Sequence, residues 1–240
     1  MVRLIVLLLA LASFAAQAAP PQKIEATYRV LKNGNQVGKI TEHFEHDGKR
    51  YRIESTTSAT GIYALFAKGN IRLVSEGEIT PNGLRPLHFE HHRGSDPAKL
   101  IVAEFDWEKR IVSHKYDGKV ETAPLEEGVQ DRISQNYQFM FQPPRRVAID
   151  IHLSTGRKLN LYNYRVVGEE TMATLVGSLP TVYLSKQRTP DEDGIGLWLA
   201  KTRHFFPVRI VFDEKDGGKL VQQLESLSPP ADAEPKPAKR

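Results

Sequence analysis

The chain has 240 residues and contains no cysteine. Lysine and arginine (33) nearly balance aspartate and glutamate (29), for a formal charge of +4, and 40% of the residues are hydrophobic. The absence of cysteine excludes disulfides and thiolate metal or redox sites. The apolar content is too high for a wholly disordered chain, and the length suits one large domain or two small ones.

The N-terminus has the features of a secretory signal peptide. Arg3 precedes an apolar run over residues 4–12, and the small residues Ala16 and Ala18 form a cleavage motif. We expect cleavage near Ala18, which makes residues 1–18 the signal peptide. The apolar run is shorter than the ~20 residues that span a bilayer, which disfavours the alternative of an uncleaved anchor. The mature chain is therefore expected to be exported, periplasmic in a Gram-negative cell and not membrane-spanning.

The middle of the chain has the pattern of antiparallel hairpins. Apolar and polar residues alternate with period two over residues 24–30, 50–54 and 208–213. Asn-Gly and Asp-Gly pairs, which tolerate the positive φ angles of tight hairpin turns, separate these segments. The pattern predicts a mainly β fold, either an antiparallel curved sheet or half-barrel, or a sandwich of hairpins. The dipeptides begin at Asn33, Asp47, Asn82, Asp117, Asp193 and Asp216.

One segment has helical spacing instead. Apolar residues recur three to four positions apart within 131–142, Asp131 is suited to cap the first turn, and Pro143 ends the helix. A second, short helical turn is expected at 61–67. Because the Pro-Pro segment after the helix is short, we favour one β-rich domain over residues 19–227 rather than two subdomains. Residues 228–240, rich in proline and charge, are expected to form a disordered tail.

The densest histidine cluster is at residues 88–92. On a strand, His88 and His92 share a face while His91 points away. Two imidazoles and a third ligand could hold a zinc ion, but no carboxylate stands at an obvious spacing nearby. We therefore interpret His88 and His92 as surface residues on an edge strand, and keep them only as weak metal candidates.

Other candidates for chemistry are weaker. Asp106 lies between two aromatic residues, but its alternation with them directs it to solvent or to the following turn. Asp131 and Ser134 are explained by helix capping and local hydrogen bonding, and a buried Arg132 would need an acidic partner that the sequence does not identify. The chain has no serine-nucleophile, phosphate-loop or calcium-loop motif, and its basic residues form no stripe typical of nucleic-acid binding. We expect no cofactor and no nucleic-acid partner.

Several short motifs carry a resemblance to a known family. They occur at residues 28–38, 79–86, 105–107, 130–134 and 206–210. In this order they resemble the proteobacterial exported family called domain of unknown function 3108, over about residues 28–227. That family has no assigned activity, so the resemblance implies no catalytic residue.

The C-terminal pattern is also similar to periplasmic lipoprotein-sorting carriers. It comprises residues 170–177, Trp198 and the pair Pro207-Val208. This similarity implies a curved antiparallel half-barrel over helices that holds acyl chains in its concavity. The chain departs from those carriers because it offers one clear helix, so the similarity is one of fold.

Three functions remain open. The leading hypothesis is a non-enzymatic periplasmic module whose apolar concavity binds a lipid-like ligand; the alternative for its aromatic residues is that they fill the core. The second is an envelope structural or interaction protein that pairs through strand edges. The third is a hydrolytic enzyme built from His88, His92 and Asp106. The proposed pocket residues are Phe105, Trp107, Tyr137, Phe141 and Trp198.

Overall fold

The computed structural model describes residues 19–228. The predicted signal peptide, residues 1–18, lies outside the described residues, as does the predicted tail except for Ser228. That residue ends the last strand instead of beginning the tail.

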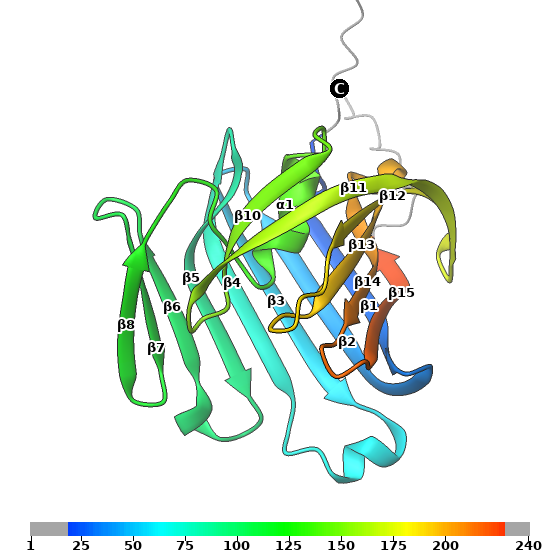
Figure 1. The fold of residues 1–240 in the computed structure, drawn as a ribbon, viewed down its shortest axis with the longest axis horizontal. Coiled ribbons are helices and arrows are strands. Elements are labelled where there is room, and N and C mark those ends of the chain that lie inside the picture. The colour runs from blue at the N-terminus through cyan, green and yellow to red at the C-terminus, as the bar shows by residue number, and fades with distance from the viewer. Residues whose placement is uncertain (1–18, 229–240) are drawn as a thin grey trace, which may run out of the picture.

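All strands belong to one sheet (Figure 1). Its order is β8-β7-β6-β5-β4-β3-β2-β1-β15-β14-β13-β12-β11-β10-β9, and every neighbouring pair is antiparallel except β9 with β10. The strands are β1 (Lys23–Lys32), β2 (Asn35–His46), β3 (Arg50–Ala59), β4 (Ile71–Thr80), β5 (Gly83–Arg93), β6 (Ile101–Asp106), β7 (Ile111–Tyr116), β8 (Lys119–Pro124), β9 (Gln130–Asp131), β10 (Ala148–Ser154), β11 (Leu159–Thr174), β12 (Gly177–Lys186), β13 (Gly194–Ala200), β14 (Phe206–Asp213) and β15 (Lys219–Ser228).

The sheet is strongly curved and does not close. Strands β1–β8 form a back layer, β10–β13 cross in front of it, and the helix α1 lies between the layers toward one end (Figure 1). The prediction of a mainly β, curved antiparallel sheet with one central helix is thus confirmed. The sandwich alternative is not what forms, because β1 and β15 pair directly and join both layers in one ladder.

Local sequence explains the strands and turns. In β3, Tyr51, Ile53 and Ser55 are buried on the concave face, while Arg52 and Glu54 alternate onto the convex face. The turn at Asn33 and Gly34 has φ angles of 49° and 87°, the positive values that the Asn-Gly pair favours. The alternating pattern therefore sets which side chains face the interior.

The helix α1 spans Ser134–Phe141, three residues shorter at its start than the predicted 131–142. The reason is that Asp131 pairs with β10 as part of β9. Its carboxylate nevertheless accepts hydrogen bonds from the backbone N–H groups of Ile133 (3.0 Å) and Ser134 (2.8 Å), so it still caps the first turn. The short turn expected at 61–67 forms the 3₁₀ helix η1 (Gly61–Leu65). Two further 3₁₀ turns are η2 (Pro97–Lys99) and η3 (Lys201–Arg203).

The helix connects two groups of buried side chains. Tyr137 and Met140 belong to a cluster built from the early strands and from residues of β12–β15, such as Phe206, and Phe139 belongs to a second cluster with Tyr164 and other residues of β10–β14. The Tyr28 hydroxyl donates to the carbonyl oxygen of Pro207 at 2.8 Å and ties β1 to β14. The helix thus holds the two layers together at one end, and leaves the other end of the concavity uncovered by it.

Substitution of Gly77, on β4, tests this packing. A Cβ atom at Gly77 would lie 2.2 Å from the carbonyl oxygen of Arg85 and 2.8 Å from the ring of Tyr51. Gly77→Ala should therefore lower the free energy of unfolding by about 2 kcal/mol or more, since the backbone of β5 must shift. Gly168→Ala, where an added Cβ meets nothing within 4 Å, is the matched control and should change stability little. Urea denaturation of both variants measures the difference; equal stabilities would contradict the close approach at Gly77.

Candidate functional site

The concave face contains a hollow with an inner and an outer part, which share one lining residue. The inner cavity, about 250 Å³, lies between the layers beside α1, and the outer hollow, about 520 Å³, lies toward η1; Thr57 lines both. Apolar side chains from both layers line the inner cavity, and Val30, Val37 and Ile71 continue the apolar surface outward. The residues of the inner wall include Ile40, Leu73, Leu153, Leu197, Ile210 and Phe212.

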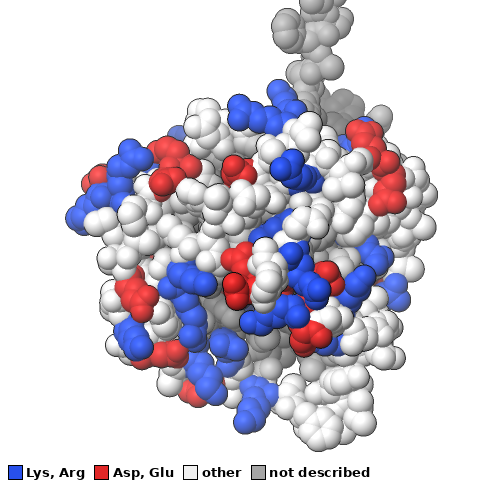
Figure 2. Space-filling view, in the orientation of Figure 1, with Lys and Arg blue, Asp and Glu red and all other residues white. Residues whose placement is uncertain are grey.

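Basic side chains stand along this hollow. Arg132 lines the inner cavity, and Lys68, Arg93 and Lys99 line the outer hollow. Lys99 is 3.4 Å from the carboxylate of Asp96, but within residues 19–228 Arg132, Arg93 and Lys68 make no ion pair. Figure 2 shows lysine and arginine side chains gathered on the lower half of this face of the molecule. The hollow therefore combines partly apolar walls with three basic side chains that make no ion pair among the described residues.

A buried histidine lies in the same region. His91 is 8% exposed, and its Nδ1 atom has no hydrogen-bond partner. It pairs across the sheet with Leu73, a residue of the inner cavity, so its ring is on the concave face. Desolvation, assisted by the positive charges of Arg132, Arg93 and Arg157, lowers the pKa of His91 to about 4. The imidazole is thus neutral near pH 7 and surrounded by cations.

The inner cavity also holds one buried acid. Glu42 is 6% exposed and accepts hydrogen bonds from the hydroxyls of Tyr137 (2.9 Å) and Ser55 (3.1 Å). Burial raises the pKa of Glu42 to about 7, although both hydrogen bonds oppose the shift. Near neutral pH this carboxyl group is therefore divided between its charged and neutral forms.

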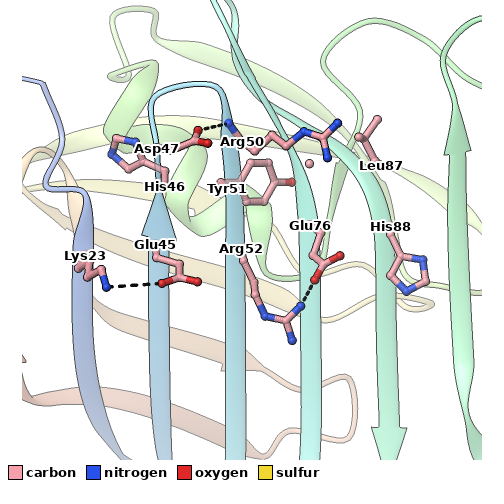
Figure 3. Close-up of a pocket in the computed structure, with 11 residues that line it drawn as sticks. Lys23, Glu45, His46, Asp47, Arg50, Tyr51, Arg52, Glu76, Leu87 and His88 are labelled. Atoms are coloured by element: carbon pink, nitrogen blue, oxygen red, sulfur yellow. Dashed lines mark hydrogen bonds and ion pairs between the residues drawn. The ribbon is translucent and has the colours of Figure 1, made fainter.

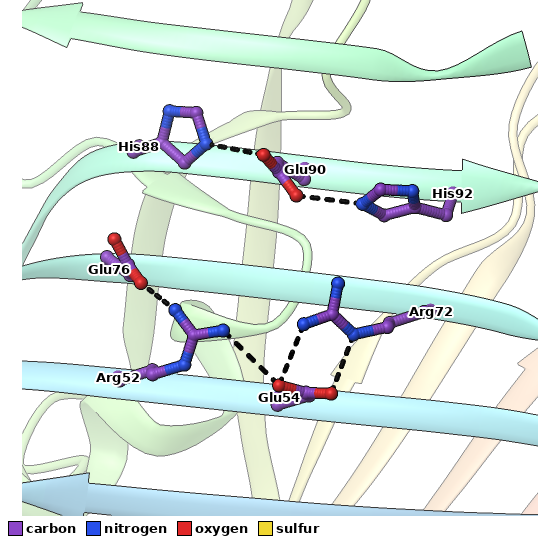
Figure 4. A network of polar contacts seen from close by, with 7 residues as sticks. All are labelled: Arg52, Glu54, Arg72, Glu76, His88, Glu90 and His92. Atoms are coloured by element: carbon purple, nitrogen blue, oxygen red, sulfur yellow. Dashed lines mark hydrogen bonds and ion pairs between the residues drawn. The ribbon is translucent and has the colours of Figure 1, made fainter. Parts of the chain in front are cut away.

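The convex face, by contrast, pairs its charges. Glu54 accepts two hydrogen bonds from Arg72, at 2.6 and 2.9 Å, and one from Arg52, which also pairs with Glu76 (Figure 4). The hydrogen bonds from Arg72, followed by those from Arg52, lower the pKa of Glu54 to about 2. These pairs satisfy each other and leave no free group for a ligand.

His88 and His92 belong to this paired surface. They share a face, as predicted, and both contact Glu90, at 3.1 and 2.8 Å (Figure 4). His88 also contacts Glu104 at 3.1 Å; partial burial lowers its pKa, but the hydrogen bonds to Glu104 and Glu90 prevail and raise it. The expectation that no carboxylate lies nearby was wrong, because Glu90 is two residues away on the same face and β6 supplies Glu104. Among the described residues, no group of three or more His, Cys, Asp or Glu side chains is arranged to hold a metal ion.

A second pocket, about 540 Å³, opens on the convex face over β1–β5 (Figure 3). Acidic and basic side chains share its lining: Lys23 lies 3.9 Å from Glu45, and Arg52 pairs with Glu76. This mixture of charges favours neither an anion nor a cation, so the concave hollow is the better candidate site.

The five proposed pocket residues do not gather in one place. Tyr137 and Phe141 both pack on Phe44, and the Tyr137 hydroxyl reaches the cavity through Glu42. Phe105 is 4% exposed, and with Trp107 it lines a separate open pocket.

Trp107 and Trp198 have their own partners. The indole N–H of Trp107 donates to the carbonyl oxygen of Pro86 at 2.7 Å. Trp198 stacks on Tyr183 at 4.3 Å, and alternation along β13 places it on the opposite face from Leu197 of the inner cavity. Both tryptophans therefore have contacts apart from the hollow.

Asp106, the third member of the hydrolytic hypothesis, is also engaged elsewhere. It accepts hydrogen bonds from the backbone N–H and the ammonium group of Lys109, at 2.9 and 2.7 Å. The bond to the Lys109 side chain is the main reason that the pKa of Asp106 is lowered. His88 and His92 have Glu90 as their partner, so the three residues share no contact.

Sequence reasoning missed Glu42, His91 and Arg132 as site residues. For Glu42 a signal exists: it interrupts the apolar series Ile40, Glu42 and Phe44 at a position that faces the core. His91 was recognised only as pointing away from its neighbours. Nothing in the local sequence places Arg132 in the cavity, because that requires the front layer to fold over α1.

Comparison with known families identifies the chain. The family model described as "Protein of unknown function (DUF3108)" matches residues 23–225. The chain belongs to the DUF3108 family. No curated protein sequence shows significant similarity to it, and none of the helices within residues 19–228 is long and apolar enough to cross a bilayer.

Two solved structures are similar to this DUF3108 chain. One is a protein from Bacteroides fragilis described as exported and as having a YmcC-like fold, with 11% identity and a TM-score of 0.39; the match covers 87% of this chain and 97% of that one. The other, from Parabacteroides distasonis, is described as a lipoprotein and has 9% identity and a TM-score of 0.35, over 87% and 96% of the two chains. Both values are too low to carry an argument about function.

The buried acid of this DUF3108 domain should make its stability depend on pH. Since the folded pKa of Glu42, about 7, lies above the ordinary value of 4.5, the folded state holds the proton more tightly than the unfolded state. Protonated Glu42 therefore adds up to about 3 kcal/mol to the free energy of unfolding. This contribution is full below about pH 4.5 and is lost as the pH rises through 7.

Urea denaturation at a series of pH values measures this dependence. Between about pH 5 and 8 the wild type should lose more stability than Glu42→Gln, which has no proton to release. Glu45→Gln, on the exposed end of β2, is the control and should follow the wild type. Parallel curves for the wild type and Glu42→Gln would contradict a raised pKa.

Proposed function

We propose that this DUF3108 protein is an exported, non-enzymatic binding module that holds an apolar, lipid-like ligand in the concave hollow. One observation carries the proposal: between the two layers the apolar side chains leave a cavity of about 250 Å³, which they line together with polar side chains, instead of closing it by packing. Export rests on the signal features of residues 1–18, and the periplasm of a Gram-negative cell is the proposed location.

The shape of the hollow favours a slender ligand. Small-molecule sites are typically about 300–1,000 Å³, and the inner cavity, at about 250 Å³, is just below that range. A single alkyl chain fits a narrow space between two sheet layers better than a bulky ring system. The similarity to lipoprotein-sorting carriers, which hold acyl chains in a concave sheet, supports the same ligand class as a hypothesis.

Strand-edge pairing with an envelope partner is the second candidate. β8 is the last strand on its side of the sheet, and most of its residues are exposed, which leaves an edge for another strand to extend. However, β8 is short and carries the charged residues Lys119 and Glu121. Short edge strands with charged side chains discourage pairing with another strand. The edge therefore supports the proposal less than the hollow does.

The ligand can be sought directly. Protein purified from the periplasm should carry a lipid-like molecule, detected by native mass spectrometry and by solvent extraction. Leu73→Trp places a larger side chain in the inner cavity and should abolish the co-purifying species, since the added ring fills the space of the chain. Val120→Trp, at a 65% exposed position on β8, should retain it. If the wild type carries no ligand and binds no added alkyl chain, the proposal fails.

A further inference from the structure

We infer that the ligand carries an anionic head group, a carboxylate or a phosphate, which Arg132 and Arg93 hold at the hollow while its alkyl chain fills the inner cavity. This inference rests on the proposed function and adds the chemical class of the ligand. It is carried by the cations of the hollow and by the unpartnered imidazole of His91 on the same concave face.

The two guanidinium groups come from separate parts of the chain. Arg132 lies between β9 and α1 and lines the inner cavity, and Arg93 ends β5 and lines the outer hollow. Both charges act on His91, and burial, assisted by the charge of Arg93, lowers the pKa of Arg132. Neither arginine makes an ion pair within residues 19–228, so an anion in the hollow would be attracted by both positive charges.

Some arginines elsewhere in the fold have acidic partners, whereas Arg209 bonds to the uncharged Gln223. Arg72 pairs with Glu54, and Arg157 pairs with Asp117 at 3.1 Å. Glu42 lines the same cavity as Arg132 but bonds to Tyr137 and Ser55. Arg132 and Arg93 make no ion pair within residues 19–228 and are thus available to a ligand, whereas Arg72 is engaged by Glu54.

His91 supplies an independent sign of a missing partner. Its Nδ1 atom is buried and makes no hydrogen bond, a situation that costs free energy in a folded protein. His91 lies opposite Leu73 of the inner cavity, on the face from which Arg93 lines the outer hollow. Guanidinium groups bind carboxylates and phosphates through paired hydrogen bonds, so Arg132 and Arg93 suit an oxyanion.

Calorimetry with chain-matched probes tests the inference. Dodecanoate and 1-dodecanol have the same chain length and differ in the head group. The wild type should bind dodecanoate at least about tenfold more tightly, because charged hydrogen bonds are stronger than neutral ones. Arg132→Gln and Arg93→Gln should each weaken the binding of dodecanoate about tenfold and leave the affinity for dodecanol unchanged. Arg209→Gln, whose partners are Gln223 and Trp198, is the control and should match the wild type.

Each outcome separates the inference from the function on which it rests. Equal binding of the acid and the alcohol overturns the anionic head group but leaves the lipid-like ligand standing. Binding of neither chain overturns both. Inorganic phosphate that binds as tightly as dodecanoate overturns the chain-bearing ligand. If Arg132→Gln does not fold, Arg132→Lys, which keeps the charge but not the paired donors, should give an intermediate loss.

A different observation carries a second inference, which does not depend on the content of the hollow. The loop between β3 and β4 exposes four large apolar side chains: Ile62 (66%), Tyr63 (45%), Leu65 (80%) and Phe66 (78%). None of the residues of η1 is buried. η1 projects at the lower edge of the sheet, where Figure 2 shows an uncharged surface (Figures 1 and 2). We propose that this tip inserts into a lipid surface that carries anionic head groups.

The charges beside the tip favour a lipid surface. Residues 60–72 contain no acid, and hydrogen bonds from Gly94 to Asn70 and from Ser95 to Lys68 bring the β5–β6 loop alongside. Lys68, Arg93 and Lys99 line one hollow there. Apolar residues flanked by cations are typical of interfacial anchors that insert about 5–10 Å. A projection of a few residues is too small for a stable protein interface, which buries about 800 Å² on each partner.

The cysteine-free sequence allows a specific test. An environment-sensitive fluorophore on Phe66→Cys should shift its emission to the blue with vesicles of phosphatidylglycerol and phosphatidylethanolamine, and much less with phosphatidylcholine alone. The same label on Val167→Cys, at a 61% exposed position, should not shift. Lys68→Gln should weaken binding to the anionic vesicles about fivefold. No shift at position 66, or an equal shift at both positions, overturns the inference, as does a concentration-dependent shift without lipid, which would indicate self-association.

Discussion

The pairing of the two ends of the domain is the contact on which the rest of the structure depends. Residues 25–32 of β1 pair with residues 220–228 of β15. Without this ladder the chain would form two separate series of hairpins. With it they become one sheet, whose continuous right-handed twist brings the late strands in front of the early ones. The concave hollow exists because α1 separates these layers at one end, and the Tyr28 hydroxyl fixes β1 against Pro207 beside it.

The interior of the sheet is less uniform than a core built for stability alone. Glu42, Asp131 and His91 are all buried. Asp131 has a structural explanation, since it caps α1 and accepts a hydrogen bond from Ser75 at 2.5 Å. Glu42 binds Tyr137 and so helps to fix the helix, but burial also moves its pKa to about 7. His91 has no comparable explanation, because its Nδ1 atom lacks a partner.

Local patterns predicted the fold better than the site. Period-two alternation and the turn at Asn33 depend on neighbouring residues, so they could be recognised in the sequence. The start of α1 was placed too early because Asp131 takes part in a strand pair with β10, a contact distant in sequence. Trp198 and Tyr137 were grouped for their aromatic character, yet they face different surroundings. Arg132 and His91 come together only when the sheet curves, and no local spacing encodes that approach.

The difference between the two faces indicates which charges are structural. On the convex face, opposite charges such as Arg72 and Glu54 neutralise one another, and exposed pairs of this kind contribute little and bind nothing else. On the concave face, Arg132 and Arg93 stand beside apolar walls without an acid partner. Such an arrangement lowers stability, and departures of this kind from consistent packing concentrate at functional sites. The unpaired cations, more than the aromatic residues, therefore support the concave hollow as the proposed ligand site of this DUF3108 protein.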